Sequence, residues 1–196
     1  MNSASTITSD YELWCDNAYK KGLLGSSFFT VGILLTVITG IYANTKGRKF
    51  SLVLSWLIGS GAVLAIGLTA FHYSITIVMY ALMGSFVAYL HMNRLYANEI
   101  GDTEFRNKAN GVIAIAWVGG ELPMIIISCY VTNWKILVAV FVTIPIVISC
   151  FCLCLLKETP LFLVARNKVK EFKDVLSYIA GVNNRKLDDK FDELGV

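Results

Sequence analysis

Residues 23–43 read LLGSSFFTVGILLTVITGIYA, an apolar stretch without a single charged side chain. At about 1.5 Å of rise per residue, a helix of this length covers the roughly 30 Å of hydrocarbon in a bilayer. Lipid offers no hydrogen-bond partners to the backbone, so a segment that crosses it in this way has to be helical. The stretch therefore predicts a membrane-spanning helix.

Four further apolar stretches follow, at about residues 50–71, 73–94, 111–131 and 136–156. The whole chain is 56% hydrophobic and 16% charged, whereas soluble domains have about 45–50% and 25%. We expect an all-α integral membrane protein whose residues 23–156 form a bundle of five spans. Residues 1–22 would be a polar tail outside the membrane, and residues 157–196 a segment of amphipathic helices on the cytoplasmic side.

The basic residues indicate the orientation of the bundle. Lys46, Arg48 and Lys49 follow the first span, Arg106 and Lys108 follow the third, and eight more Lys and Arg follow the fifth. One side thus carries 13 of the 17 Lys and Arg, which predicts a cytoplasmic C-terminus and an outside N-terminus. An odd number of spans with this orientation is also what remains when an upstream span is lost. The small net charge of +3 argues against a nucleic-acid partner.

Catalytic and metal-binding patterns are not found in the sequence. The chain has no nucleophile elbow, no phosphate-binding loop and only two histidines, so we expect neither an enzyme nor a bound metal or cofactor. Cys129, Cys150, Cys152 and Cys154 lie inside apolar runs and are expected to act as small buried hydrophobic residues. Alternate residues of a helix point to different faces, which argues against a metal site in the Cys150-x-Cys152-x-Cys154 motif.

Polar side chains inside the predicted spans are the candidates for a binding site. Glu121 lies near the middle of the fourth span, and Tyr80, His91 and Arg94 recur at helical spacing along the third. A charge inside the bilayer costs about 2.5–3.5 kcal/mol on insertion scales, so Glu121 should face protein or water. Because of the depth of Glu121 in its span, we expect His91 to lie nearer to Glu121 than Arg94 does. The group is either a polar clamp between two helices or part of a cavity that binds a substrate or a proton.

Small residues predict close contacts between spans. They recur at spacings of three or four, as Gly32, Thr36 and Gly40 on the first span and as Ser55, Gly59 and Ala62 on the second.

The C-terminal segment is expected to be helical. Thr159 can cap a helix whose first residue is Pro160. An apolar stripe follows at Val169, Phe172, Leu176 and Ile179, and Gly181 suits the end of the helix. Such a helix lies on the membrane face or under the bundle, or it forms a docking site for a soluble partner.

Five motifs occur in an order that resembles the major facilitator superfamily, nearest its organic cation, anion and carnitine transporter branch. They are Trp14–Lys20, Gly40–Lys49, Tyr96–Glu99 with Arg106, Asn133-Trp134-Lys135 with Pro145, and Lys157–Leu163. The resemblance covers nearly the whole chain. It implies that the chain holds the second to sixth spans of the family's first six-helix half, and that residues 1–22 end its large outside loop.

The resemblance also assigns residues to family motifs. The gate loop corresponds to Gly40, Asn44, Gly47, Arg48 and Lys49, and the cytoplasmic motif to Glu99, Arg106, Glu158, Thr159 and Pro160. By the resemblance, Asn44 replaces the family's acid in the gate loop and Thr45 replaces the loop's first arginine. We therefore expect the loop to keep its turn better than the charged contact that the family's acid makes across the cytoplasmic gate. Arg94 stands where the family often has an aromatic residue, and it would favour anions if it faces a cavity.

The resemblance implies that the chain is part of a secondary transporter of small organic ions. Such a carrier is surrounded by membrane lipid, and the resemblance implies the plasma membrane. Family transport uses two halves that rock about a site between them, so five spans of one half should not transport alone. We expect a truncated product or one chain of a split carrier, with another chain supplying the missing helices. The alternative is a repurposed half-bundle that serves as a structural subunit of a larger membrane complex, for example in an organelle.

Overall fold

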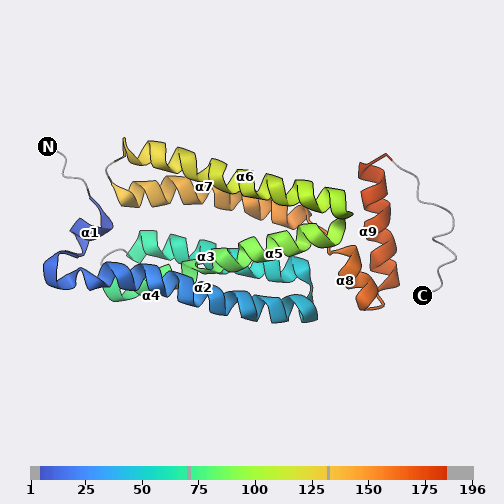
Figure 1. The fold of residues 1–196 in the computed structure, drawn as a ribbon, viewed down its shortest axis with the longest axis horizontal. Helices are drawn as coiled ribbons and strands as arrows, with labels where there is room; N and C mark the ends of the chain where they lie inside the picture. The colour runs from blue at the N-terminus through green and yellow to red at the C-terminus, as the bar shows by residue number, and fades with distance from the viewer. Residues whose placement is uncertain (1–4, 70–71, 132, 185–196) are drawn as a thin grey trace.

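The computed structural model describes residues 5–69, 72–131 and 133–184, and its regular elements there are helices (Figure 1). The helices in the apolar stretches are α2 (Tyr19–Lys46), α3 (Arg48–Thr69), α4 (Tyr73–Met83), α5 (Ser85–Ile100), α6 (Thr103–Ser128) and α7 (Trp134–Leu155). The remaining helices are α1 (Ile7–Asp10), η1 (Cys15–Asn17), α8 (Pro160–Ala165) and α9 (Val169–Val182).

Four helical stretches of the described residues are long and apolar enough to cross a membrane. They are Cys15–Lys46, Arg48–Leu68, Tyr73–Ile100 and Thr103–Ser128. These four confirm the first four predicted spans. Helix α7 coincides with the fifth predicted stretch, although several of its side chains lie outside the described part of the chain.

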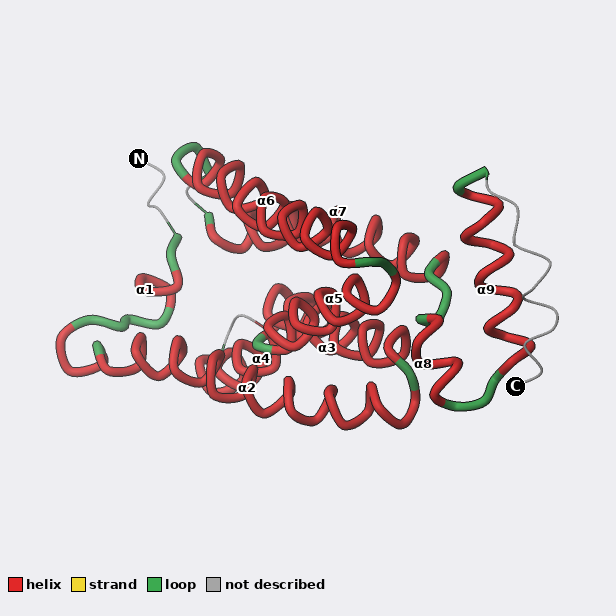
Figure 2. Tube along the Cα trace, turned by 45° about the vertical axis from the view of Figure 1, so that its right-hand side comes forward, coloured by secondary structure: helices red, strands yellow, loops and turns green. Residues whose placement is uncertain are grey.

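Helices α2 to α5 pack into one layer, and α6 and α7 form a second (Figures 1 and 2). Helix α7 lies against α3, whereas α6 contacts α7 and the end of α5 and buries none of its residues. A core of Ala43, Leu52, Met92, Tyr96 and Leu153 joins the two layers near one end.

The third predicted span is divided at Gly84 into α4 and α5. A Cβ at Gly84 would overlap the Phe28 carbonyl oxygen of α2, and a Cβ at Gly32 would lie 2.9 Å from the Gly84 carbonyl oxygen. Glycine is therefore required on both sides of this contact. The close approach predicted at Gly32 is confirmed, whereas Gly40 has open space around it.

On α3, the predicted small-residue face is confirmed, since Ser55, Gly59 and Ala62 are all buried. Gly59 lies directly against Ser85 and Phe86 of α5. The two helices can approach so closely because Gly59 has no side chain.

Cysteines are less buried than predicted. Cys129 and Cys154 are exposed and Cys150 is half-buried, while the Cys152 side chain lies outside the described residues. The prediction of burial was wrong for the exposed thiols because an apolar run in a membrane protein marks lipid-facing positions as readily as core positions.

The C-terminal segment forms two helices. Thr159 precedes α8 and Pro160 is its first residue, as predicted, but the helix ends at Ala165 because Asn167 adopts a left-handed φ of 55°. Helix α9 then packs on α8 through a cluster of Phe162, Leu163 and Val175, flanked by Phe172 and Ile179. Phe172 and Ile179 of the predicted stripe thus face α8, but the most buried residue of α9 is Val175, which the stripe did not include.

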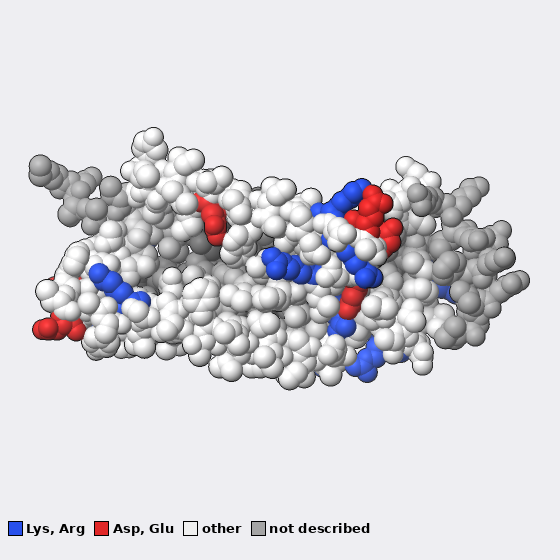
Figure 3. All heavy atoms as spheres, viewed as in Figure 1, with Lys and Arg blue, Asp and Glu red and all other residues white. Residues whose placement is uncertain are grey.

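The ends of the molecule differ in charge. The α2–α3, α5–α6 and α7–α8 connections share the end beside α9, and the N-terminal tail lies at the other (Figure 1). Charged side chains gather near the α9 end and are few along the middle of the visible face (Figure 3). The basic linkers found in the sequence are thus on one side of the bundle.

The N-terminal tail is tied to the start of α7 through Asp10. The Asp10 carboxylate accepts hydrogen bonds from the Trp134 indole at 3.1 Å and the Ser5 hydroxyl at 2.9 Å, and it pairs with Lys135 at 3.3 Å. Tyr11 shares a 2.6 Å hydrogen bond with Thr76 of α4. The tail therefore connects α4 with α7. The Trp134 hydrogen bond is the main reason that the pKa of Asp10 lies below its ordinary value, while partial burial acts in the opposite direction.

We predict that attachment of the tail depends on pH through Asp10. Because the folded pKa is lowered, the contribution of Asp10 is complete above its unfolded value, near pH 4, and is lost as the pH falls through the folded value. Hydrogen exchange of residues 5–13, corrected for intrinsic rates, should show protection that falls below about pH 4. Asp10→Asn should lower protection at neutral pH and remove the acid step. Glu12→Gln, at an exposed position, is the matched control, and an acid step that persists in Asp10→Asn would contradict the assignment.

Candidate functional site

Gly47 alone connects α2 with α3, and it can do so because it lacks a side chain. Its φ of 113° and ψ of 162° lie in a region that only glycine adopts readily. A Cβ at this position would overlap the carboxylate of Glu158, which lies directly against the turn. A tight turn is thus present at Gly47, and the contact with Glu158 explains why the turn tolerates no side chain.

Glu158 caps the N-terminus of α3 from 110 residues farther along the chain. Its carboxylate accepts hydrogen bonds from the backbone N–H groups of Arg48 at 2.9 Å and of Lys49 at 3.1 Å. It also accepts one from the backbone of Thr159 at 3.0 Å. The first N–H groups of a helix have no partner within the helix and carry partial positive charge, so an anion is stabilised there.

Arg48 and Glu99 form an ion pair that is largely shielded from solvent. The Arg48 Nε donates to both oxygens of Glu99, at 2.8 and 3.0 Å, and the two side chains are 15% and 7% exposed. The Arg48 guanidinium also donates to the Asn44 side-chain oxygen at 2.8 Å. Arg48 therefore links α2, α3 and α5 at one point.

Thr159 extends this cluster to α8. Its hydroxyl donates to Glu99 at 2.7 Å instead of capping its own helix, and its side chain is fully buried. The expected side-chain cap at Thr159 was wrong because Glu99, a charged acceptor, lies within reach of the hydroxyl. We call Arg48, Glu99, Glu158 and Thr159 the gate cluster.

Two more hydrogen bonds hold the linker and α8 against the bundle. Tyr96 donates to the Lys157 carbonyl at 2.6 Å, and Arg166 donates to the Asn44 carbonyl at 2.6 Å. Sequence patterns did not indicate either contact, because both acceptors are backbone carbonyls.

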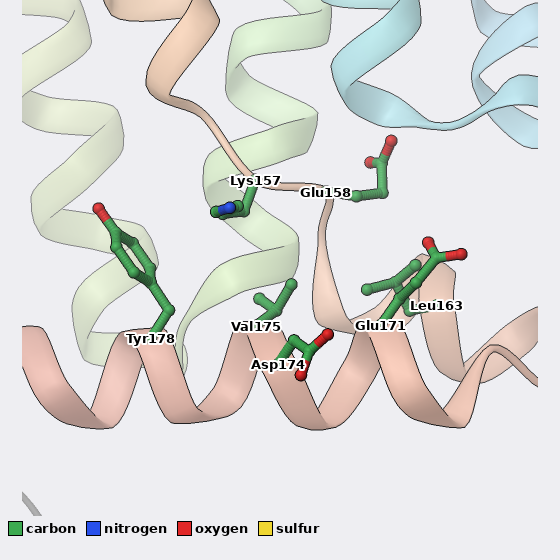
Figure 4. A pocket seen from close by; sticks show the side chains of 7 residues that line it. All are labelled: Lys157, Glu158, Leu163, Glu171, Asp174, Val175 and Tyr178. Carbon is green, nitrogen blue, oxygen red and sulfur yellow. The ribbon is translucent and has the colours of Figure 1, made fainter.

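A pocket of about 410 Å³ lies between α9 and the linker that carries Lys157 and Glu158 (Figure 4). Asp174 and Tyr178 belong to its α9 wall, and the Lys157 ammonium lies 5.8 Å from the centre of the Tyr178 ring. The Glu158 side chain points away from α9 toward the α2–α3 turn (Figure 4). Glu158 thus lines this pocket while its carboxylate caps the start of α3.

Arg106, Lys49 and Gly40 of the predicted motifs are not part of the gate cluster. Arg106 donates to the Gly101 carbonyl at 3.0 Å and so closes the α5–α6 turn. The Lys49 side chain lines a groove between α3 and α7. Gly40 lies within α2, and a Cβ at this position would have no neighbouring atom within 4 Å.

The predicted intramembrane residues are spread over three helices. Tyr80 is half-buried on α4, with its ring 5.9 Å from that of Phe28. His91 and Arg94 are exposed on α5, and Glu121 is exposed on α6. Within the described residues, no hydrogen bond or ion pair joins Glu121 to His91 or Arg94.

The polar clamp between α5 and α6 uses different residues. The Asn110 side chain donates to the Asn98 side chain at 2.9 Å, close to the α5–α6 turn. This pair could have been suspected from the sequence, since two amides on either side of a tight turn are brought together by antiparallel helices.

Gly47→Ala is expected to lower the free energy of unfolding by about 1–3 kcal/mol, because alanine must adopt an unfavourable backbone conformation and displace Glu158. Thermal unfolding of the purified protein in detergent measures the change. Gly40→Ala is the matched control, because its position has open space in a helix and should be neutral or slightly stabilising. Equal loss of stability in both variants would contradict the role of Gly47.

Glu99→Gln is expected to cost about 3 kcal/mol, because it leaves the Arg48 charge shielded and unpaired. Its comparison is Glu104→Gln, which breaks an exposed pair with Lys108 and should change stability by less than about 1 kcal/mol. The same unfolding experiment applies. If the two variants are equally stable, the Arg48–Glu99 pair does not hold the cluster together.

Known proteins resemble this chain along nearly its whole length. Residues 2–195 match the family described as "Sugar (and other) transporter". Solute carrier family 22 member 16 of Xenopus laevis is 26% identical over 199 residues, which cover 98% of this chain and 34% of that protein. Solute carrier family 22 member 7 of Mus musculus is also 26% identical, over 95% of this chain and 34% of its own length.

Organic cation/carnitine transporter 2 of Mus musculus is 24% identical over 91% of this chain and 32% of that protein. The chain thus spans about a third of the length of the curated relatives that it matches. The resemblance noted in the sequence motifs is confirmed at the level of the family. The chain belongs to the sugar (and other) transporter family of the major facilitator superfamily, whose members are membrane transporters and not enzymes.

Proposed function

We propose that this chain forms most of one lobe of a secondary transporter of small organic ions. In this proposal α7 is the fifth span, the N-terminal tail lies outside, and the gate cluster faces the cytosol. The observation that carries the proposal is the gate cluster itself. It joins α3, α5 and α8, and through the Arg48–Asn44 hydrogen bond also α2, at the end where the basic linkers gather. A lobe that rocks as one body needs its helices tied together in this way.

Glu121, Arg94, His91 and Tyr80 are proposed to line the substrate path. Because Asn98 and Asn110 already clamp α5 to α6, the polar groups deeper in the spans are not needed for that purpose. A carboxylate and a guanidinium exposed to hydrocarbon would be costly, so both are proposed to face a polar cavity. Arg94 would favour anionic or zwitterionic substrates over cations.

The exposure of α6 supports the proposal that further spans accompany those described. It buries none of its residues, although it carries Glu121 near its middle. We propose that additional membrane-spanning helices cover it, either from a longer polypeptide or from another chain, and that the complete carrier lies in the plasma membrane.

A second candidate function is a half-bundle that supports a larger membrane assembly. Asn44 favours it, because this position holds an uncharged amide instead of the family's acid. Its side chain accepts from Arg48 and its carbonyl accepts from Arg166, so both groups are used within the same lobe. An assembly of unrelated subunits that lacks solute uptake would support this function.

The proposal predicts uptake only when the chain is accompanied by further spans. The tagged chain is purified in mild detergent with its bound proteins, reconstituted into vesicles, and assayed with an alkylammonium cation, a benzoate-type anion and carnitine. Glu121→Gln and Arg94→Gln are expected to reduce uptake roughly tenfold, equivalent to about 1.4 kcal/mol of lost substrate interaction.

Lys108→Gln, at an exposed position in the first turns of α6, is the control and should transport normally. Uptake by the chain without additional spans would overturn the requirement for further helices. Full uptake by Glu121→Gln and Arg94→Gln would overturn the substrate path.

A further inference from the structure

A groove of about 440 Å³ runs along the outside of the bundle between α3 and α7, and the proposed transport path does not use it. Its walls are Lys49, Val53, Trp56 and Leu57 on α3, with Cys150, Leu153 and Cys154 on α7. The α3 residues follow each other at spacings of one, three and four, so they share one helix face. The α7 residues do the same. Two aligned helix faces therefore form an elongated groove, about 12 Å long from Lys49 to Leu57.

Apart from Lys49 at one end, the groove is lined by apolar and thiol side chains. Trp56 belongs to its α3 wall and makes ring contacts with Phe86 and Tyr89 of α5, at 5.2 and 4.8 Å between ring centres. A volume in the range of about 300–1,000 Å³ with mostly apolar walls is typical of small-molecule sites. The shape and the single charged end suit a ligand with an acyl chain and an anionic head.

Among the described residues that line the groove, Lys49 is the one that carries a charge, and its ammonium makes no ion pair with another described residue. The nearby acid, Glu158, directs its oxygens to backbone N–H groups at the start of α3. Arg48, the preceding residue, is already paired with Glu99. The half-buried Lys49 side chain is thus available to an external anion, and its aliphatic part can lie along the apolar wall.

We propose that this groove binds one anionic phospholipid of the inner leaflet, with the phosphate on Lys49 and an acyl chain along Val53, Trp56 and Leu57. The leaflet rests on the proposed orientation of the chain, in which the α2–α3 turn faces the cytosol. Charge complementarity selects this occupant, because anionic lipids are concentrated in the cytoplasmic leaflet and basic residues near its surface attract them.

Native mass spectrometry of the purified protein with equimolar phosphatidylglycerol and phosphatidylcholine of identical acyl chains tests the site. The wild-type protein should retain phosphatidylglycerol with roughly fivefold preference, as expected for one basic residue near a headgroup. Lys49→Gln should bind both lipids about equally. Lys46→Gln removes an exposed charge from the same turn outside the groove and should keep the preference.

Val53→Trp fills the groove and should reduce retention of both lipids. The thiols give a second measurement, since bound phosphatidylglycerol should slow maleimide labelling of Cys154 but not of Cys129 on the far end of α6.

Equal retention of the two lipids by the wild-type protein would overturn the proposal. The proposal would also be overturned if Lys46→Gln lost the preference for phosphatidylglycerol as fully as Lys49→Gln. Dissociation of a dimer of this chain by Val53→Trp, without loss of lipid, would overturn it as well. None of these outcomes depends on transport, so the proposed function is tested separately.

Discussion

The carboxylate of Glu158 at the start of α3 is the contact on which the charged end of the molecule depends. It receives hydrogen bonds from three backbone N–H groups, two on α3 and one at Thr159. A carboxylate that is partly removed from water needs such partners, and the unpaired N–H groups of a helix N-terminus supply them. Gly47 permits this approach because it has no Cβ.

Other parts of the gate cluster follow from that contact. With α8 held at the α2–α3 turn, Thr159 comes within 2.7 Å of Glu99, and Glu99 receives Arg48 from the other side. The same turn directs the neighbouring Lys49 to the groove between α3 and α7. Two successive residues of this turn thus differ in role, since Arg48 forms an internal ion pair and Lys49 lies on the outside of the bundle.

Shape and not charge holds the middle of the layer formed by α2 to α5. The contact between Gly32 and Gly84 allows the backbones of α2 and of the α4–α5 junction to touch. Helix α6 has no comparable contact, being tied at its ends through the Asn98–Asn110 pair and its packing on α7. This difference agrees with the proposal that α6 borders on spans beyond those described.

Sequence alone determined the helical character, the first four spans, the Gly47 turn and the family, because these depend on local composition and on short motifs. It also indicated the apolar stripe of α9. It did not determine the partners of Glu158, Thr159 or Asn44, since these contacts join segments 60 to 122 residues apart. Spacing along a helix gives the depth of Glu121 and His91 but not the direction in which each faces. That direction depends on how the helices rotate and pack, and only the tertiary structure decides it.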